Sequence, residues 1–394
     1  MKKIIFLIAL ALCLPAFARA ADFSTNAKSA FLMDFESGGA IVEKDADVLM
    51  PPSSMIKLMT IALAFDALQD GRLKMDDKIA VSDNSDYRNP VWNTASKICL
   101  SKGQEISVRD ALLGLVVMSG GDAGVAMAER LAGSEADFTT MMLKKARVLG
   151  MEKSSFGNAT GLPAPDNLMT SRELGILGAY IVEAYPEFYP MFSARQFEFA
   201  GYESGWCQQW GSLHSISYNK LLFIMPGADG LKTGHTADGG YGMVASAKRG
   251  NRRLVGVING LRAKDHNALA GEMKRMLEYG FANTTTRTFF KAGDTVAKIP
   301  VWYGRQEQVE AVAAKNVAIT LRNGQGISGV RILARYSDPV SAPVRAGDRI
   351  GDIVVENDGR IVATVPMVAK SNVNKTRYLG RIFKNIGIIF GGKK

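Results

Sequence analysis

Two kinds of apolar periodicity alternate along the chain. Near the N-terminus, strand-like runs at Ser29–Glu36 and Ala40–Asp45 flank Ser37-Gly38-Gly39, a pattern that predicts a β-hairpin. From Ser54 to about residue 185 the apolar residues recur with a helical period, interrupted by segments that contain Gly and Pro. This part of the chain is therefore expected to be mainly helical.

Strand periodicity returns further along the chain. Two apolar runs between residues 240 and 261 are separated by the turn Lys248–Asn251, and a helical pattern follows from Ala268 to Tyr279. Strands at both ends of a helical region predict an α+β domain whose sheet is assembled from segments far apart in the sequence. We place this domain at residues 21–284.

The pattern then changes to short β-rich runs. Asn323-Gly324 follows one such run, and Asp358-Gly359 lies between the runs Ile350–Glu356 and Arg360–Ala369. Asn-Gly and Asp-Gly between alternating apolar residues are specific signals of hairpins. The sequence therefore predicts two hairpins within a small all-β domain at residues 285–370.

The two ends of the chain carry apolar segments of another kind. Lys2-Lys3, the apolar run Ile4–Leu14 and the small-x-small site Ala18-Arg19-Ala20 predict a secretory signal peptide over residues 1–20. Residues 371–394 place apolar side chains at helical spacing with basic residues mostly opposite, which predicts an amphipathic helix on a membrane surface. A helix that packs on its own protein is the alternative.

Charge and composition narrow the function classes. The 394 residues carry a formal net charge of +10, but three positive charges lie in the signal peptide and six lie in residues 372–394. The remaining body has a net charge of +1, which argues against nucleic acid as a partner. Three histidines without a zinc-binding motif argue against a metal site, and no cofactor is expected. Cys99 and Cys207 could form a disulfide or remain free thiols, and no pattern indicates an oligomeric state.

The first candidate for chemistry is Ser54-Met55-Ile56-Lys57, at the predicted start of a helix. Residues three apart on a helix share a face, so the Ser54 hydroxyl and the Lys57 amine can act as nucleophile and base without a histidine. Ser217-Tyr218-Asn219-Lys220 matches the same pattern, but no helical pattern follows it. The alternative for Ser54 is an ordinary serine at a helix start.

Two further motifs offer suitable groups. Lys232-Thr233-Gly234-His235 lies on a predicted edge strand, where Lys232 supplies a charge that can lower the pKa of a neighbouring lysine or attract a carboxylate. Thr233 offers a hydroxyl to a substrate carboxylate, and Gly234 leaves room for a peptide-like substrate beside the strand. Ser119-Gly120-Gly121 precedes another predicted helix.

In their order and spacing, the three motifs resemble those of the penicillin-binding proteins. Gly157–Leu162, Asp229–Thr236, the β-rich C-terminal part and the basic tail are similar to the low-molecular-mass, serine-type D-alanyl-D-alanine carboxypeptidases. The resemblance implies a transpeptidase-like domain with an antiparallel sheet and helices. It also implies export to the periplasmic face of a bacterial cytoplasmic membrane, peptidoglycan stem peptides ending in D-Ala-D-Ala as substrates, and acylation by β-lactams.

The same resemblance implies roles for individual residues. Ser54 would be the nucleophile, Lys57 its base, and Ser119 a proton relay toward the leaving D-alanine. The pair Lys232-Thr233 would hold the terminal carboxylate of the substrate. The backbone N–H groups of Ser54 and His235 would form the oxyanion hole.

One position departs from the family pattern. The second motif of the family ends in Asn, whose amide contacts the substrate and the active-site lysine, whereas here the position is Gly121. Either acylation is weakened, or Asp122 or a water fills the space. Asp122 could also serve only the start of its helix, where a carboxylate is favourable. Gly121 motivates an alternative function, a catalytically weak muropeptide-binding or cell-shape protein on the same scaffold.

The remaining candidate residues have less support for a role in catalysis or binding. His214 and His266 are expected on the surface, and Arg262 could assist carboxylate binding. Glu173 lacks the Glu-x-x-Leu-Asn setting in which class A β-lactamases place their deacylating acid. A β-lactamase is therefore the less favoured third alternative.

Overall fold

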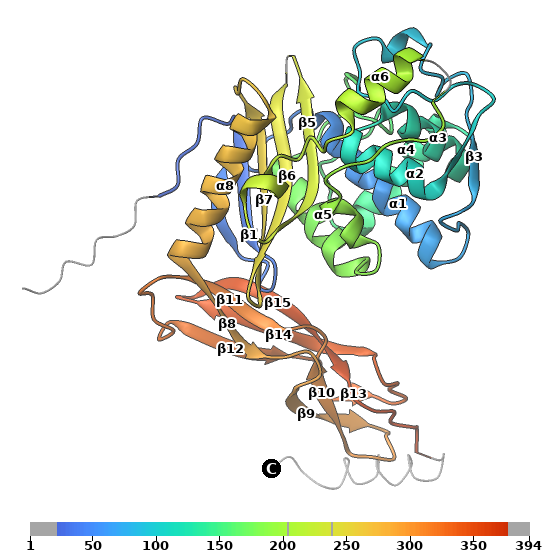
Figure 1. The fold of residues 1–394 in the computed structure, drawn as a ribbon. Coiled ribbons are helices and arrows are strands. Elements are labelled where there is room, and N and C mark those ends of the chain that lie inside the picture. Colours follow the sequence, from blue (N-terminus) through green and yellow to red (C-terminus); the bar gives the residue numbers. More distant parts are fainter. Residues whose placement is uncertain (1–21, 203–204, 238, 377–394) are drawn as a thin grey trace, which may run out of the picture.

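The structure is a computed structural model that describes residues 22–202, 205–237 and 239–376 (Figure 1). The predicted signal peptide and residues 377–394 of the predicted terminal helix lie outside the described residues. Within the described ranges, no helix is both long enough and apolar enough to cross a bilayer.

A five-stranded antiparallel sheet forms the centre of the N-terminal domain, in the order β2-β1-β7-β6-β5. Its strands are β1 (Ser29–Asp34), β2 (Ala40–Lys44), β5 (Ala228–Thr236), β6 (Gly240–Arg249) and β7 (Arg252–Leu261). The predicted N-terminal hairpin is formed, and Ser29 faces Asn259 on β7. A sheet assembled from distant segments, with helices between them, confirms the predicted α+β class.

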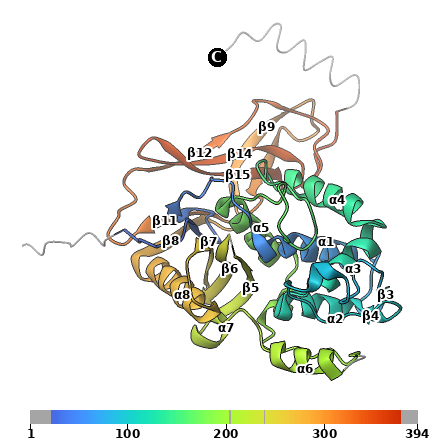
Figure 2. The same ribbon diagram turned by 90° about the horizontal axis from the view of Figure 1, so that it is seen from above.

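Helices cover both faces of this sheet (Figure 2). They are α1 (Lys57–Gln69), α2 (Val108–Leu113), α3 (Gly121–Ala132), α4 (Glu135–Val148), α5 (Ser171–Ala184), α6 (Gly205–His214), α7 (Leu221–Ile224) and α8 (His266–Asn283). Alternate residues of β1 serve opposite faces, because Phe31 packs in the large helical core and Leu32 packs in the smaller core beneath α8. Strands buried on both faces are expected to be apolar throughout, as the runs on β6 and β7 are.

Helix α1 is buried on nearly all sides, since ten of its 13 residues are buried. Apolar side chains all round such a helix are typical of a central position in a large core. The turn before it, η1 (Ser53–Ile56), is a 3₁₀ turn that lies against β5. This packing brings Ser54 to the edge strand that carries Lys232-Thr233-Gly234.

Short elements connect these helices. The strands β3 (Lys78–Ala80) and β4 (Glu105–Ser107) pair with each other, and η2 (Pro90–Trp92) lies in the loop between them. The π-helical turn η3 (Gly114–Met118) ends directly before Ser119.

The C-terminal domain is all β, which confirms that part of the predicted fold. A six-stranded sheet has the order β12-β14-β15-β10-β9-β13, and β8 pairs with β11. The strands are β8 (Thr284–Phe290), β9 (Thr295–Trp302), β10 (Gln308–Ala313), β11 (Val317–Arg322), β12 (Val330–Arg335), β13 (Val340–Ser341), β14 (Arg349–Asn357) and β15 (Arg360–Ala369). One apolar core unites them.

The two predicted hairpins of this domain have different outcomes. The one at Asp358-Gly359 is confirmed, because Asn357 at the end of β14 pairs with Arg360 at the start of β15. The one at Asn323-Gly324 is wrong, because β11 pairs with β8 and β12 pairs with β14. Helix α8 runs directly into β8, and this strand, not β12, becomes the hydrogen-bonded neighbour of β11.

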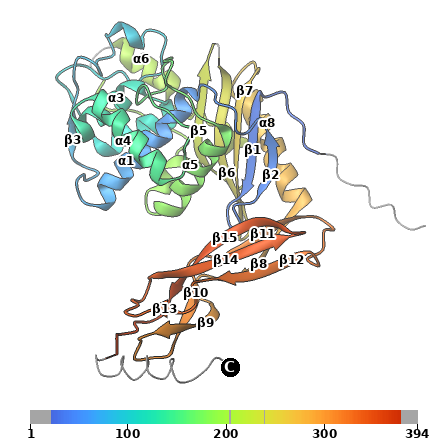
Figure 3. The ribbon, with the colours of Figure 1, turned by 180° about the vertical axis from the view of Figure 1, so that it is seen from behind.

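The domains meet at the tip of the β1–β2 hairpin (Figure 3). The buried Asp34 carboxylate accepts hydrogen bonds from Arg252 and from Thr286 of β8. At the far end, Val373 bridges to Val344 and Lys375 bridges to Gly304. These bridges carry the β-rich domain beyond the expected boundary at residue 370.

Candidate active site

Ser54 and Lys57 lie where η1 passes into α1. The Lys57 Nζ atom lies 2.8 Å from Ser54 Oγ and 2.5 Å from the carbonyl oxygen of Thr160. Lys57 is 3% exposed, so little water competes for its amine. The structure thus brings together the two groups that the Ser-x-x-Lys spacing predicts to share a face.

Burial decides the protonation of this amine. It lowers the pKa of Lys57 from 10.5 to about 7, while the negative charge of Asp122 opposes the shift. The second contact of Nζ is to a neutral carbonyl, which orients the amine without adding a charge. A lysine with such a pKa is partly neutral at pH 7 and can accept a proton from the neighbouring hydroxyl.

Lys232 lies beneath the floor of the site. Its side chain is 1% exposed, and Nζ donates to the Thr233 carbonyl at 2.9 Å. Burial lowers the pKa of Lys232 well below its usual value, and the charge of Lys57 lowers it further. We expected Lys232 to lower the pKa of Lys57, but the cause at Lys57 is burial.

Gly234 has a role inside the fold besides the one we expected. A Cβ at this position would lie 3.0 Å from the Pro52 carbonyl oxygen and 3.1 Å from the Ser54 backbone nitrogen. Such contacts are too tight, so the glycine allows β5 to pack directly on the segment that carries the nucleophile. The expectation that Gly234 also leaves room for substrate stays a prediction.

The loop from Gly157 to Leu162 supports the same segment from below. Asn158 Oδ1 accepts hydrogen bonds from the backbone nitrogens of Thr160 and Gly161 at 3.1 and 2.7 Å. Gly161 has a φ of +81°, and a Cβ there would lie 2.0 Å from the Ser53 carbonyl oxygen. This loop therefore needs its glycine to bring the Thr160 carbonyl onto Lys57. The sequence marked it only as part of a family pattern.

Ser119 follows η3 in a left-handed conformation with φ of +59°. It is 3% exposed, and its Oγ has no hydrogen-bonding partner in the part of the chain that the structure describes. A strained backbone and an unpaired buried hydroxyl both cost stability, and such features gather at functional sites.

Trp92 occupies the space beside Gly121. A Cβ on Gly121 would lie 2.5 Å from Trp92 Cζ3 and 3.3 Å from the Ser96 carbonyl oxygen. The indole is 1% exposed, and its Nε1 donates to the Asn84 carbonyl at 3.0 Å. An aromatic ring thus stands where the family places an amide side chain, and no sequence signal connected these two positions.

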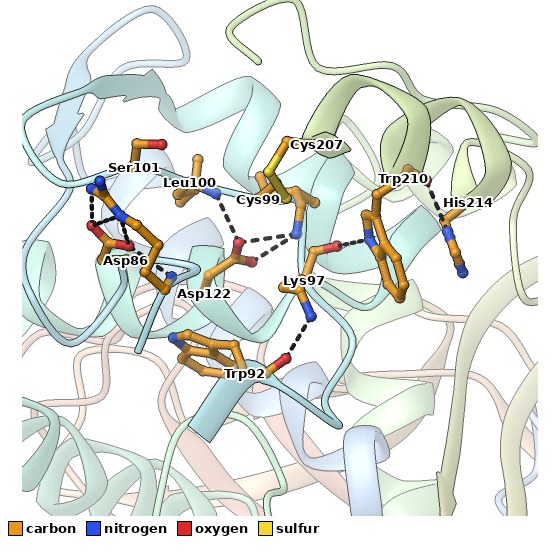
Figure 4. The surroundings of a disulfide bond; sticks show 12 residues. Asp86, Trp92, Lys97, Cys99, Leu100, Ser101, Asp122, Cys207, Trp210 and His214 are labelled. Carbon is orange, nitrogen blue, oxygen red and sulfur yellow. Dashed lines mark hydrogen bonds and ion pairs between the residues drawn. A yellow bond between two sulfur atoms is a disulfide. The ribbon is translucent and has the colours of Figure 1, made fainter. Parts of the chain in front are cut away.

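Asp122 does not fill that space. Its buried carboxylate accepts backbone hydrogen bonds from Ile98 and Ala123 at 2.9 to 3.0 Å and from Leu100 at 3.1 Å, the last of which Figure 4 shows. Desolvation nevertheless raises the pKa of Asp122. Of the alternatives weighed from the sequence, the helix-start role is the nearer one, and the same carboxylate also binds the backbone on both sides of Cys99.

The two cysteines form a disulfide that ties this segment to α6. The Cα atoms of Cys99 and Cys207 are 5.8 Å apart. Beside the bond, Trp210 Nε1 donates to the Lys97 carbonyl at 3.3 Å, and Lys97 Nζ donates to the Trp92 carbonyl at 2.5 Å (Figure 4). The loop that carries Trp92 is therefore held in place both by the hydrogen bonds of Asp122 and by the disulfide.

A cavity of about 930 Å³ joins these groups. Ser54, Lys57, Ser119 and the segment Thr233–His235 line it, whereas Lys232 is not among the lining residues described. Ser217 is buried elsewhere and does not line the cavity, which separates the second Ser-x-x-Lys match from the first. A nucleophile, a partly neutral base and an unpaired hydroxyl thus face one space.

His214 and His266 were expected on the surface, and the structure places both half-buried at the cavity. Both imidazoles line the cavity together with Tyr218. His266 is the first residue of α8 and packs parallel to the Tyr218 ring, with centroids 5.2 Å apart. Arg262 is exposed and is not a lining residue. Sequence spacing gave no sign of these three rings, because α6, α8 and the loop between α6 and α7 meet only in the fold.

Comparisons with known proteins agree with this geometry. The family described as D-alanyl-D-alanine carboxypeptidase matches residues 16–263, and the penicillin-binding protein 5 C-terminal domain matches residues 285–375. The carboxypeptidase DacF of Bacillus subtilis is 31% identical over 94% of this chain and 91% of its own, and DacC of Escherichia coli is 30% identical over 91% and 87%. The crystal structure of penicillin-binding protein 5 from Haemophilus influenzae aligns with a TM-score of 0.76 and 29% identity, covering 90% of this chain and 99% of that one. The chain therefore belongs to the D-alanyl-D-alanine carboxypeptidase family.

Proposed function

We propose that this protein is a serine D,D-carboxypeptidase that removes the terminal D-alanine from peptidoglycan stem peptides through an acyl-enzyme at Ser54. The observation that carries the proposal is the 2.8 Å contact between Lys57 Nζ and Ser54 Oγ, with a lysine pKa of about 7. At neutral pH about half of the Lys57 amine is then free to accept a proton.

The reaction proceeds in two steps. Ser54 Oγ attacks the carbonyl carbon of the penultimate D-alanine while its proton passes to Lys57 Nζ. The oxyanion accepts hydrogen bonds from the backbone N–H groups of Ser54 and His235, a role supported by the close packing of β5 at Gly234. The C–N bond then breaks, and the departing amine gains a proton by way of Ser119 Oγ.

In the second step water adds to the ester carbonyl and releases the shortened peptide and Ser54 Oγ. Lys57 is the base available to that water. Glu173 is committed elsewhere, because its carboxylate accepts hydrogen bonds from the Lys153 nitrogen at 2.8 Å and the Ser154 hydroxyl at 2.6 Å. Penicillins acylate the same serine, and among the described residues no aspartate or glutamate lines the cavity to speed the hydrolysis of their ester.

A catalytically weak muropeptide-binding protein is the alternative that a specific observation motivates. Trp92 fills the space in which the family amide would contact substrate and lysine. Loss of one such positioning group slows catalysis by about 10²- to 10³-fold without abolishing it. We therefore favour a working enzyme.

A penicillin-labelling experiment with a matched control tests the proposal. The mature protein, Ser54→Ala and Ser217→Ala are incubated with a fluorescent penicillin and, separately, with a peptide ending in D-Ala-D-Ala. Wild type and Ser217→Ala should be labelled and should release D-alanine, whereas Ser54→Ala should do neither. Labelling without D-alanine release would indicate the muropeptide-binding alternative, rapid lactam turnover would indicate a β-lactamase, and labelling that survives Ser54→Ala would refute the acyl-enzyme mechanism.

We also propose that the protein is exported and held at the periplasmic surface of the cytoplasmic membrane by its C-terminal segment. The signal-like N-terminus and the basic, apolar pattern beyond residue 376 support this location. A chain ending at residue 376 should leave the membrane fraction and keep its hydrolysis of soluble peptides. Retention of the shortened chain on membranes would contradict the assignment.

A further inference from the structure

The cavity lacks the charged groups that most often bind a carboxylate. Among the described lining residues there is no arginine, aspartate or glutamate. Lys232, the expected carboxylate partner, is not among them and donates to the Thr233 carbonyl. Lys57 is engaged with Ser54. The donors left for an anionic end of a substrate are therefore uncharged, and they comprise hydroxyls such as those of Thr233 and Ser119 together with the imidazoles.

His266 is the imidazole with an unused hydrogen-bonding capacity. Its Nδ1 is buried and has no partner within the described residues. The preceding Asp265 is occupied, because its Oδ1 accepts the Ala268 backbone N–H at 2.8 Å. A buried polar atom without a partner costs about 1 to 3 kcal/mol, so its retention calls for an explanation.

Two tyrosines fix the plane of this ring. Tyr218 stacks on it at 5.2 Å with an interplanar angle of 6°, and Tyr241 packs edge-on at 5.2 Å. Tyr241 also pairs with His235 across β5 and β6, and their rings are 4.1 Å apart. The His266 ring is thus held beside the strand that carries Thr233.

Because Nδ1 is enclosed, it determines which nitrogen of the His266 ring can bind a ligand. A proton on Nδ1 would have no acceptor, so the neutral ring is favoured with its proton on Nε2. The nitrogen available to the cavity is then a neutral N–H donor. His214 differs, because its Nδ1 lies 2.8 Å from the Trp210 carbonyl oxygen.

The surroundings of His266 keep its ring neutral. Burial is the main cause that lowers the pKa of His266 to about 4, Lys232, His235 and Lys220 act in the same direction, and Asp265 opposes the shift. The ring is therefore uncharged at pH 7 and meets a ligand through a hydrogen bond, not through an ion pair. A neutral N–H donor suits a carboxylate that must be bound and later released.

From this placement, and resting on the proposed function, we infer that His266 binds the C-terminal carboxylate of the substrate through Nε2–H, beside the Thr233 hydroxyl. This contact makes the enzyme select peptides and lactams with a free carboxylate. It replaces the role that Lys232 and Arg262 were expected to fill.

The test compares ligands with and without the carboxylate. Ser54 acylation rates with benzylpenicillin and with its methyl ester are measured by mass spectrometry for wild type, His266→Phe, His266→Gln and His214→Phe, together with D-alanine release from a D-Ala-D-Ala peptide. His266→Phe keeps the ring between the tyrosines but removes the donor. It should slow the acid by about 10- to 100-fold, as expected for a hydrogen bond to a charged group, and leave the ester rate unchanged.

The variants separate binding from structure. His266→Gln keeps an N–H donor and should recover part of the acid rate, while His214→Phe should leave the acid-to-ester ratio as in wild type. Since Nδ1 has no partner to lose, His266→Phe should melt at the wild-type temperature or higher. An unchanged ratio in His266→Phe, or equal losses for acid and ester, would overturn the inference while the proposed function stands. Absence of Ser54 acylation and of D-alanine release in wild type would overturn both.

Discussion

Replacing Gly121 by the asparagine of the family should damage the protein, although it restores the family motif. Gly121 is the first residue of α3, and its added Cβ would stand 2.5 Å from Trp92 Cζ3 and 3.2 Å from Cη2. Carbon atoms in contact prefer about 3.5 to 4.0 Å, so the ring must move by roughly 1 Å or more.

The ring has little freedom to make that movement. Trp92 is 1% exposed, and Nε1 is bonded to the Asn84 carbonyl at 3.0 Å. Overpacking of this kind typically costs about 1 to 3 kcal/mol. In a domain of this size the melting temperature of Gly121→Asn should fall by roughly 2 to 12 °C.

A double-mutant cycle with Trp92→Ala tests the assignment. Denaturant unfolding and penicillin acylation are measured for wild type, both single variants and the double variant. Once the ring is gone the asparagine has room, so the double variant should be more stable than the sum of the single effects by at least about 1 kcal/mol. It should also acylate faster than Trp92→Ala alone.

Gly271→Asn provides the matched control. Gly271 lies inside α8, and a Cβ there meets no atom within 4 Å. This variant should change the free energy of unfolding by less than about 0.5 kcal/mol. If Gly121→Asn is as harmless as the control, or if the effects of the two site variants simply add, Trp92 does not exclude the family side chain.

Three further predictions concern the groups around the base. Lys57→Met should stop acylation yet stabilise the fold by up to about 4 kcal/mol at pH 7, a gain that should shrink toward pH 10.5 because the unfolded lysine keeps its proton between the two pKa values. Denaturant curves at several pH values check this, and a less stable variant at pH 7 contradicts it. Asp122→Asn should lower the pKa of Lys57 further and shift the rise of the acylation rate to lower pH, and an unmoved pH profile speaks against the coupling. Replacing Cys99 and Cys207 by serine opens a loop of 108 residues, so the free energy of unfolding should fall by about 4 kcal/mol. Acylation should also become slower. An unaltered acylation rate would show that the loop carrying Trp92 keeps its position without the disulfide.

The periodicity of apolar residues was sufficient to predict the helices and strands that bury apolar faces. The runs on β1, β6 and β7 are apolar because both sheet faces are covered, and the helical pattern after Ser54 reflects a helix buried on nearly all sides. The Ser54–Lys57 contact was also predictable, since one turn of helix determines it. These are local consequences of a repeating pattern.

The periodicity of apolar residues could not predict the contacts between loops. Trp92 contacts Gly121, and Gly161 contacts Ser53, through loops whose sequences have no period. Only the folded structure therefore shows why these two positions require glycine. The wrong prediction of a hairpin at Asn323-Gly324 has a similar origin, because a local turn signal does not determine which distant strand pairs with β11. His266 was missed because the start of a helix says nothing about the cavity that it faces.

The partners of the buried lysines explain how the site keeps a base at neutral pH. Lys57 and Lys232 each donate to a backbone carbonyl, of Thr160 and of Thr233, and not to a carboxylate. A neutral carbonyl favours the charged form of the amine much less than a carboxylate at the same distance, which would raise the pKa and remove the base. Among the described residues, Asp122 is the acid that acts on Lys57; it already accepts hydrogen bonds from the backbone N–H groups of Ile98, Leu100 and Ala123, and it opposes the shift without cancelling it. The loop glycine at 161 is therefore as necessary to the chemistry as the lysine, because without it the Thr160 carbonyl could not reach the amine.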